Sequence, residues 1–439
     1  MPSAINNSSS THEPQNDDPD STTYRQDLHP IADDPFEQHD VVVVGAGPSG
    51  LFCALKMAQK GIDVLVIESG SAISESPRAI AYMPIVLNEF EKVGIFDDLV
   101  ELGHQNNDGI QFRTPHNKGD ELLTTVKLNL VPKSFKRYPF IGINTGQDRL
   151  AHLILKHAQR LPNFHVKFSH TFAGVQQDDN GVRITAVTSR GEKYFAAKYL
   201  IGADGAGSSV RRSQCIPFRG FTWNDFRFMA VNIEYDFASH GYSTGVMVVD
   251  EEDWAVIARI DKEGLWRVAF GVRCSIPEKE LLAQLPEKLE RLMPGPRPLN
   301  YKIVAANPYW AHQRVAEKLT SGRVVLTGDA AHSNNPIGGL GLTTGLLDAT
   351  ALGNCMIRIL TKNEPDPAAL LERYSTVRKK AFVEYTNTAS IENKLRLHCQ
   401  DDEFKTKRAA FIKNITDDPE ATINMAKAMN EVMDDDFEE

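Results

Sequence analysis

The sequence predicts an α/β fold in which a parallel sheet with its helices carries an inserted antiparallel sheet and is followed by C-terminal helices. Between residues 40 and 68, an apolar run, a glycine turn, a helix-period segment and a second apolar run follow one another. Between residues 221 and 272, the segments are rich in β-branched and aromatic residues, and no long helical pattern separates them. The length of 439 residues exceeds what one hydrophobic core usually covers.

We predict four parts along the chain. Residues 1–36 are rich in Ser, Asn, Asp and Pro, which cannot offset the entropy of ordering, so we expect a disordered tail there. The main α/β domain is expected to be discontinuous, over 37–215 and 300–400, with an inserted β-sheet domain at 216–299. Residues 401–439 are expected to form an acidic helical segment.

The cysteines and the apolar segments indicate a cytoplasmic protein. The five cysteines form no C-x-x-C pair, which argues against a disulfide framework or a zinc site, and we predict no metal site. Residues 1–36 contain no apolar run that could serve as a signal peptide. No uninterrupted apolar stretch reaches the roughly 18 residues of a membrane span, so we expect no integral membrane segment.

Charge separates the two ends of the chain from its middle. The net charge is −10, of which residues 1–40 contribute −8 and residues 401–439 contribute −7. The middle therefore carries about +5, which is compatible with anionic small molecules. Because no clustered basic run with interleaved aromatic residues occurs, we expect no nucleic-acid partner.

The segment "DVVVVGAGPSG", from residue 40 to 50, is typical of a Rossmann-like dinucleotide site. The valine run fits a parallel strand that is covered on both faces. Gly45 allows the tight turn, Gly47 lets the backbone approach a pyrophosphate, and Gly50 lets the helix lie close to the strand. Glu68, at the end of the next apolar run, is placed to accept hydrogen bonds from a ribose. The motif alone does not distinguish NAD from FAD.

Two later segments extend the pattern. "YLIGADGAGSSVRRS" (199–213) and "GRVVLTGDAAHSNNPIGGLGLTTGLLDATALG" (322–353) each end an apolar run in a glycine beside an aspartate. With them the sequence, over roughly 40 to 390, resembles the single-component FAD-dependent aromatic hydroxylases, the flavin monooxygenases related to para-hydroxybenzoate and phenol hydroxylases. Its "GLWRV" and "HQR" segments, together with Gly322 and Arg323, resemble those of fungal-type members.

The resemblance implies which residues hold FAD. The Rossmann glycines and Glu68 would bind the adenosine diphosphate half. Arg78 and Gln147 match positions that contact the flavin's linking chain. Asp204 matches an aspartate implicated in FAD and nicotinamide binding, and Asp329 matches one that accepts a hydrogen bond from the ribityl chain.

The segment "NPIGGLG", which contains Pro336, Gly341 and Leu342, is implied to bring backbone close to the flavin ring. The helix that starts there can stabilise negative charge on the reduced flavin. The chain departs from the family where many relatives have Gln and Asn, because it carries Leu340 and Thr343 instead.

No second G-x-G-x-x-G follows a predicted strand. Family members have no separate nicotinamide domain, so the resemblance implies that a mobile flavin meets NAD(P)H as a transient co-substrate. Reduced flavin would then react with O₂ to give a C4a-hydroperoxide that hydroxylates a small aromatic (phenolic) or polyketide-like substrate. Epoxidation or Baeyer–Villiger oxygenation of a non-phenolic metabolite, and a flavin-bearing redox-regulated binding module, remain alternatives.

We expect the antiparallel sheet to cover the substrate. On the strand "RFMAVNIEY", alternation places one set of side chains on one face, namely Arg227, Met229, Val231, Ile233 and Tyr235. Arg227 and Tyr235 are the candidate catalytic residues, since they could pair with a phenolate. The alternative is that this face packs against the core.

Other residues are predicted to be structural. His332 resembles an acid–base residue, but its place in the flavin loop favours a structural role. Trp254, Trp266 and Trp310 are expected in the core. The oligomeric state is not predicted.

Overall fold

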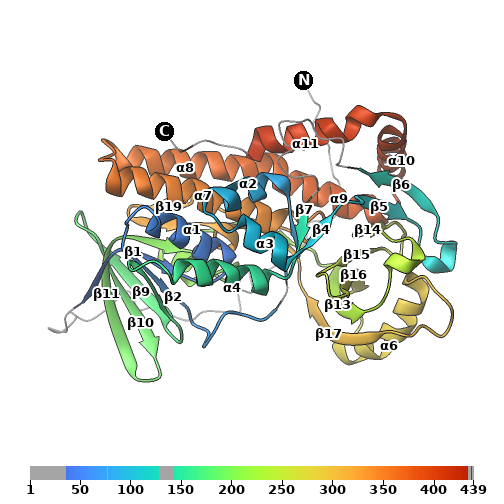
Figure 1. Cartoon of the computed structure of the whole chain (residues 1–439), viewed down its shortest axis with the longest axis horizontal. Helices are drawn as coiled ribbons and strands as arrows, with labels where there is room; N and C mark the ends of the chain where they lie inside the picture. Colours follow the sequence, from blue (N-terminus) through green and yellow to red (C-terminus); the bar gives the residue numbers. More distant parts are fainter. Residues whose placement is uncertain (1–35, 77, 128–141, 434–436, 438–439) are drawn as a thin grey trace, which may run out of the picture. The chain divides into compact units, whose positions relative to one another are not determined.

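The computed structural model describes residues 36–76, 78–127, 142–433 and 437 (Figure 1). The tail predicted at 1–36 therefore lies, apart from its last residue, outside the described residues. Within the described part no helix is long and apolar enough to cross a bilayer.

The first sheet is built on five parallel strands. In order these are β8 (Phe164–Lys167), β2 (Val64–Ile67), β1 (Glu37–Val44), β11 (Gly191–Gly202) and β20 (Val324–Leu326), and β19 (Thr320–Ser321) pairs antiparallel with β20. The valines at 41–43 in β1 have no exposed surface. Such a continuous apolar run is what a strand covered on both faces requires.

Two further strands form an antiparallel ribbon with the long β11, and they are β9 (Thr171–Gln177) and β10 (Val182–Thr188). Helices pack against the parallel strands through one buried cluster, which includes residues of α1 (Pro48–Ala58), α4 (Gln147–Ala158), α7 (Leu340–Thr361) and α8 (Pro367–Ala381) (Figure 1). Pro48 starts α1 at a position where a missing N–H costs nothing.

The second sheet has seven strands. Their order is β17 (Lys302–Tyr309), β13 (Phe226–Glu234), β16 (Leu265–Arg273), β15 (Ala255–Arg259), β14 (Gly245–Val248), β5 (Ile110–Arg113) and β6 (Leu122–Val126). All neighbours are antiparallel except β14 and β5. Because β5, β6 and β17 lie outside 216–299, the sheet is larger than the predicted insertion. The predicted α/β class with two sheets is confirmed.

Two three-stranded sheets complete the strands. One contains β12 (Phe218–Thr222), β18 (His312–Ala316) and β21 (His332–Ser333), and the other β3 (Ala81–Tyr82), β7 (Gly142–Asn144) and β4 (His104–Asn106). The other helices are α2 (Pro84–Lys92), α3 (Phe96–Leu102), α5 (Ser209–Ser213), α6 (Glu278–Leu292), α9 (Thr388–His398), α10 (Asp402–Asp417) and α11 (Pro419–Met433). Short helical turns are η1 (His116–Lys118), η4 (Ala238–His240), η5 (Gly328–Ala330) and the π-helical η6 (Phe382–Asn387).

Candidate functional site

A cavity of about 1690 Å³ lies within the part of the chain from residue 36 onward. One side, here called the loop wall, is lined by residues of the segments 44–49, 68–83, 203–209 and 329–342. The other side, here called the strand wall, is lined by residues of β13, β14, β15, β16 and β17. Parallel strands bring their carboxyl ends to one edge, and the loop wall begins at that edge, after β1, β2 and β11.

The glycine turn after β1 is shaped by backbone contacts. Gly45 has φ +110°, and a Cβ there would lie 2.4 Å from the carbonyl oxygen of Ala203. A Cβ at Gly50 would lie 2.2 Å from the carbonyl oxygen of Gly45. Gly47 lines the cavity, and a Cβ there would meet no protein atom within 4 Å. Gly45 and Gly50 are therefore required because the protein's own backbone leaves no room for a Cβ, whereas Gly47 leaves open space for a ligand.

Glu68 lies at the end of β2 and lines the same wall. Its Oε2 accepts a hydrogen bond from the N–H of Ala46 at 2.8 Å, and its Oε1 accepts one from the N–H of Gly70 at 2.8 Å. These backbone donors hold the carboxylate in place. Oε1 also accepts a hydrogen bond from the hydroxyl of Ser69 at 3.1 Å, so Oε2 is the oxygen that keeps a further lone pair for a ribose hydroxyl.

Arg78 lies in the loop before β3, Gln147 is hydrogen-bonded to that loop, and both residues line the cavity. Gln147 begins α4, its backbone N–H donates to the carbonyl oxygen of Ala79 at 2.9 Å, and its side-chain Oε1 accepts from the N–H of Ala79 at 3.4 Å. The carbonyl oxygen of Arg78 accepts a hydrogen bond from Arg267 on β16. This loop is therefore tied to both walls.

Asp204 lines the cavity but uses its carboxylate within the protein. It accepts hydrogen bonds from the hydroxyl of Ser208, from the N–H of Ser209 at 2.7 Å and from the N–H of Val210 at 3.1 Å. Burial raises the pKa of Asp204, and these donors oppose the rise. Asp204 therefore orders the start of α5 and presents the rest of its surface to the cavity.

Asp329 in η5 turns its exposed surface to the cavity. Its enclosed position raises its pKa through desolvation, while His332 and Arg78 oppose the rise. A ligand hydroxyl that donates to this carboxylate would replace lost water. Asp329 is thus suited to bind a polyol chain.

The segment from Pro336 to Leu342 forms the end of the loop wall. Pro336, Gly341 and Leu342 all line the cavity. Gly339, with φ +67°, directs the chain into α7, which starts at Leu340. The first turn of α7 therefore lies at the cavity, where its free N–H groups favour negative charge.

The two positions that depart from the family pattern do not line the cavity. Leu340 and Thr343 are 5% and 2% exposed, and the hydroxyl of Thr343 donates to the carbonyl oxygen of Gly339 at 3.2 Å. His332 is buried as well, hydrogen-bonded to Asp348 at 2.5 Å and stacked on Phe382. These contacts favour a structural role for His332.

The strand wall contains polar residues that the sequence reasoning did not select. Arg267, Asn232 and Tyr309 line it together with small apolar residues such as Ala230. The Nε of Arg267 donates to Oδ1 of Asn232 at 3.0 Å. Burial lowers the pKa of Arg267 and raises the pKa of Tyr309 to about 12. Arg267 stands in "GLWRV", which signalled the family but named no site residue.

The face of β13 that was predicted to cover the substrate is the wrong one. Ala230 and Asn232 line the cavity, whereas Met229, Val231 and Ile233 belong to a buried cluster with leucines of α6. Alternate side chains of β13 therefore do point to opposite faces of the sheet, as the sequence predicts. The covering helix α6 decides which set faces inward, and strand periodicity carries no information about it.

Arg227 and Tyr235 are not among the residues that line the cavity, although the guanidinium of Arg227 lies 5.9 Å from the ring centroid of Trp310, which is one of them. Arg227 donates from Nη2 to the carbonyl oxygen of Ile276 at 2.5 Å. The hydroxyl of Tyr235 donates to the carbonyl oxygen of Pro294 at 2.6 Å. Both side chains fasten the sheet to the ends of α6, so their placement corrects the expectation that they meet the substrate.

Of the three tryptophans predicted to lie in the core, two are buried and one is exposed. Trp254 and Trp266 are 0% and 2% exposed, as expected of core residues. Trp310 is 46% exposed and lines the cavity. The core prediction is therefore wrong for Trp310, because it follows the last residue of the outermost strand, β17.

Comparison with known proteins identifies the family and the fold. The sequence model of the FAD binding domain family matches residues 38–389. The para-nitrophenol 4-monooxygenase of Pseudomonas sp. strain WBC-3 is 40% identical over 354 residues, which cover 80% of this chain and 86% of the relative. The 6-hydroxy-3-succinoylpyridine 3-monooxygenase HspB of Pseudomonas putida strain DSM 28022 / S16 is 33% identical, over 82% of this chain and 89% of the relative.

Solved structures agree. The crystal structure of p-nitrophenol 4-monooxygenase PnpA from Pseudomonas putida DLL-E4 has a TM-score of 0.85 at 35% identity, covering 91% of this chain and 99% of that one. Aklavinone-11 hydroxylase, solved with FAD and aklavinone, has a TM-score of 0.73 at 24% identity, covering 84% of this chain and 70% of that one, which supports the fold alone. This chain therefore belongs to the FAD binding domain family and is a flavin-dependent monooxygenase of aromatic compounds, with FAD as its cofactor and NAD(P)H and O₂ as its co-substrates.

Proposed function

We propose that the enzyme hydroxylates a single-ring phenol that binds as its phenolate against the strand wall, with para-nitrophenol as the first candidate. The observation that carries this proposal is the partly buried cation of Arg267, which lines the cavity beside Asn232 and near Tyr309. A guanidinium that has lost part of its water favours an anion. The 40% identical relative is named for para-nitrophenol, which readily forms such an anion.

We also propose that FAD binds along the loop wall. The residues proposed to hold it are Gly45, Gly47, Gly50, Glu68, Arg78, Gln147, Asp204, Asp329, Pro336, Gly341 and Leu342. Of these, Gly50 is the one that does not line the cavity, and it acts by letting α1 approach the turn. When bound, FAD would be reduced by NAD(P)H and would then activate O₂.

Residues of the protein would bind the aromatic ring of the substrate and favour its phenolate form. Arg267 would hold the phenolate oxygen, and loss of the phenol proton makes the ring richer in electrons for attack by an electrophilic oxygen. Tyr309 keeps its hydroxyl proton, since burial raises its pKa to about 12, and so acts as a donor. Apolar residues of β13 to β16 would exclude water from the reacting carbon.

The size of the cavity favours a small substrate. A ligand pocket commonly measures about 300 to 1,000 Å³, and the cavity of about 1690 Å³ has to hold FAD as well as the substrate. A polyketide-like substrate is the larger alternative, and its support is limited to distant likeness of fold. The fungal-type assignment also stays a prediction, since the relatives named above are bacterial.

The domain boundaries and the location in the cell are proposals too. We propose that residues 37–215 and 300–400 form the FAD-binding domain, except for β5, β6 and β17, which join the sheet of 216–299 to make the substrate domain. We propose a cytoplasmic location because none of the five cysteines, which all lie within the described residues, forms a disulfide bond, as is typical of reducing compartments. Fractionation of cells that express the tagged protein tests it, and recovery in the secreted fraction would contradict it.

The function is tested with purified FAD-loaded enzyme and a panel of phenols and hydroxypyridines. We expect para-nitrophenol to raise NAD(P)H oxidation about tenfold or more, and one atom of ¹⁸O₂ to enter the ring. Insertion at the carbon that carries the nitro group would release nitrite, which gives a second readout. Stimulation by 6-hydroxy-3-succinoylpyridine but by no phenol would move the proposal to hydroxypyridines, and oxygen found in an epoxide or ester would favour the non-phenolic alternative.

A further inference from the structure

Two histidines and an aspartate meet at the edge of the first sheet that is opposite to the cavity. His39 lies near the start of β1, Asp63 directly precedes β2, and His165 is the second residue of β8. These three strands are parallel neighbours, so their amino ends lie side by side. The FAD-binding turn and Glu68 follow the carboxyl ends of β1 and β2, so the cluster is separate from the active site.

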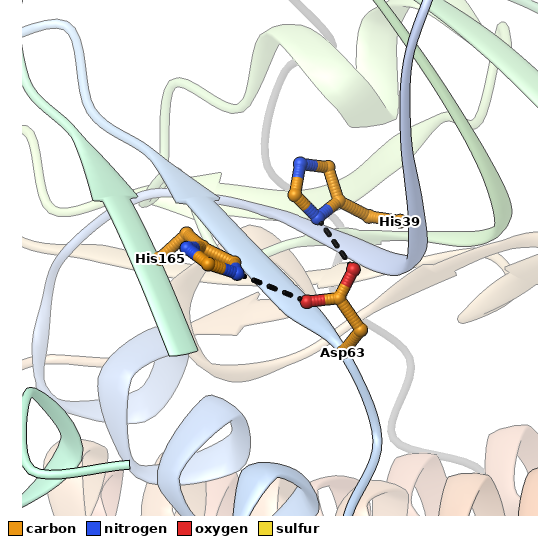
Figure 2. A group of neighbouring side chains, drawn as sticks. All are labelled: His39, Asp63 and His165. Atoms are coloured by element: carbon orange, nitrogen blue, oxygen red, sulfur yellow. Dashed lines mark hydrogen bonds and ion pairs between the residues drawn. The ribbon is translucent and has the colours of Figure 1, made fainter. Parts of the chain in front are cut away.

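Both histidine rings point at one carboxylate, as Figure 2 shows. Nδ1 of His39 lies 2.8 Å from Oδ2 of Asp63, and Nε2 of His165 lies 3.1 Å from Oδ1. The three ligand atoms lie within 4.8 Å of one another. Around a tetrahedral zinc ion, with bonds of about 2.0–2.2 Å, neighbouring ligand atoms are roughly 3.3 Å apart. Small movements of the side chains would therefore admit the ion.

The surroundings of His39 resemble those of a metal ligand. Its other nitrogen, Nε2, lies 3.2 Å from Oε1 of Glu37, and Lys167 holds the second oxygen of Glu37 at 3.1 Å. A neutral imidazole that donates its proton to Glu37 turns the lone pair of Nδ1 toward Asp63. A carboxylate that orients the far nitrogen of a metal-bound histidine is a common outer contact of zinc sites.

Burial and charge also suit a cation. The side chain of His39 is 6% exposed, while Asp63 and His165 are 36% and 45% exposed, so an ion can enter and keep a water ligand. The backbone of Asp63 is fixed, because its N–H donates to Asp40 at 3.1 Å and its carbonyl oxygen accepts from the N–H groups of Asp40 and Val41. Lys167 and Lys198 each pair with a neighbouring carboxylate, Glu37 and Asp40, which leaves the charge of Asp63 for the ion.

We propose that His39, Asp63 and His165 form a Zn²⁺ site that joins the amino ends of β1, β2 and β8. Two imidazoles and one carboxylate are a ligand set that zinc accepts, with water in the fourth position, whereas Mg²⁺ prefers oxygen ligands. The site stabilises the sheet from the end opposite to the flavin. It takes no part in the oxygenation, so it is independent of the proposed substrate.

The test is calorimetric titration of ZnCl₂ into the full-length, FAD-loaded protein after removal of metals with a chelator and of any affinity tag. We expect one saturable site with micromolar or tighter affinity. His165→Ala is the main variant, because this exposed side chain can be removed without opening the core. We expect it to weaken Zn²⁺ binding about tenfold or more, and Asp63→Asn to do the same.

His152→Ala is the matched control. His152 is also exposed, and its Nδ1 hydrogen-bonds to the carbonyl oxygen of Asp148 on its own helix at 2.9 Å; we expect its removal to leave Zn²⁺ affinity unchanged. Equal Zn²⁺ affinity of His165→Ala and the parent would overturn the proposal, as would the absence of saturable binding below 1 mM. Equal binding of Mg²⁺ would also overturn it, because it would show attraction to carboxylates alone.

Discussion

The two walls of the cavity are made in different ways. The loop wall is formed by turns, where backbone contacts such as that between Gly45 and Ala203 leave no room for a Cβ. The strand wall is formed by side chains, and its chemistry depends on single residues such as Arg267. The comparison teaches that the wall proposed to hold FAD would do so through backbone shape, while the wall proposed to hold the substrate could change its specificity one residue at a time without altering the fold.

The largest effect should follow from a side chain in the glycine turn. Gly45→Ala places a Cβ 2.4 Å from the carbonyl oxygen of Ala203 at φ +110°, so β1 and β11 have to shift. We expect the variant to lose most of its FAD, measured as flavin absorbance per protein, and to unfold at a lower temperature.

Gly47→Ala is the matched variant on the same turn. A Cβ there meets no protein atom within 4 Å, and its φ of −74° suits alanine. We therefore expect weaker FAD binding with an unchanged melting temperature of the flavin-free protein. If Gly47→Ala held FAD as tightly as the parent, the open space above this turn would not be taken by the cofactor.

The second prediction concerns the strand wall. Arg267→Met removes a partly buried cation that donates a hydrogen bond to Asn232, and a charged hydrogen bond contributes about 1.5 to 3 kcal/mol. We expect kcat/KM for the phenol to fall about ten- to a hundredfold while most of the FAD is retained. Arg267→Lys should recover part of this loss because it keeps the charge.

Arg183→Met is the control, since Arg183 is exposed on β10 and pairs with Asp178 at 3.8 Å. It should leave kcat/KM unchanged. A parent-like kcat/KM in Arg267→Met, at equal FAD content, would mean that the phenolate is bound elsewhere in the cavity.

The third prediction is a smaller effect with a defined pH dependence. Tyr309→Phe should lower kcat/KM about three- to tenfold, the amount expected for one neutral hydrogen bond. Because burial raises the pKa of Tyr309 to about 12, the parent keeps this proton throughout pH 7–10. The ratio of the two enzymes should therefore stay constant over that range. If the ratio of the two kcat/KM values approached one near pH 10, the side chain of Tyr309 would have an ordinary pKa.

The same contrast explains what could be predicted from the sequence. Gly45, Gly47 and Glu68 were recognisable because the turn and the strand ends that define them lie within one short βαβ segment. Arg267 and Tyr309 come together only when β16 and β17 pair on either side of β13. Such pairings between distant segments leave no periodic signal in a single sequence.

The choice of strand face shows this limit at one element. Periodicity separated Arg227 and Tyr235 from Asn232, but either set could have faced the cavity. The decision rests with α6, whose apolar side covers the first set. The residues of α6 follow a helical period, but that period does not indicate the sheet face against which the helix packs. The cluster of His39, Asp63 and His165 was missed for the same reason, because three separate strands supply it.

The smallest effect is expected from Tyr235→Phe, on the far face of the strand wall. The hydroxyl of Tyr235 donates to the carbonyl oxygen of Pro294 at 2.6 Å, and its ring stacks with that of His240 at 5.7 Å between centroids. The hydroxyl also lies 3.2 Å from Nε2 of His240. Removing these two partly exposed hydrogen bonds should lower the free energy of unfolding by about 1 to 2 kcal/mol, measured by urea denaturation of the FAD-loaded enzyme. Because the side chain does not line the cavity, kcat/KM and substrate-stimulated flavin reduction should stay within about twofold of the parent. A large fall in substrate-stimulated reduction at unchanged stability would show that this face communicates with the substrate after all, and the division of β13 into an inner and an outer face would have to be abandoned.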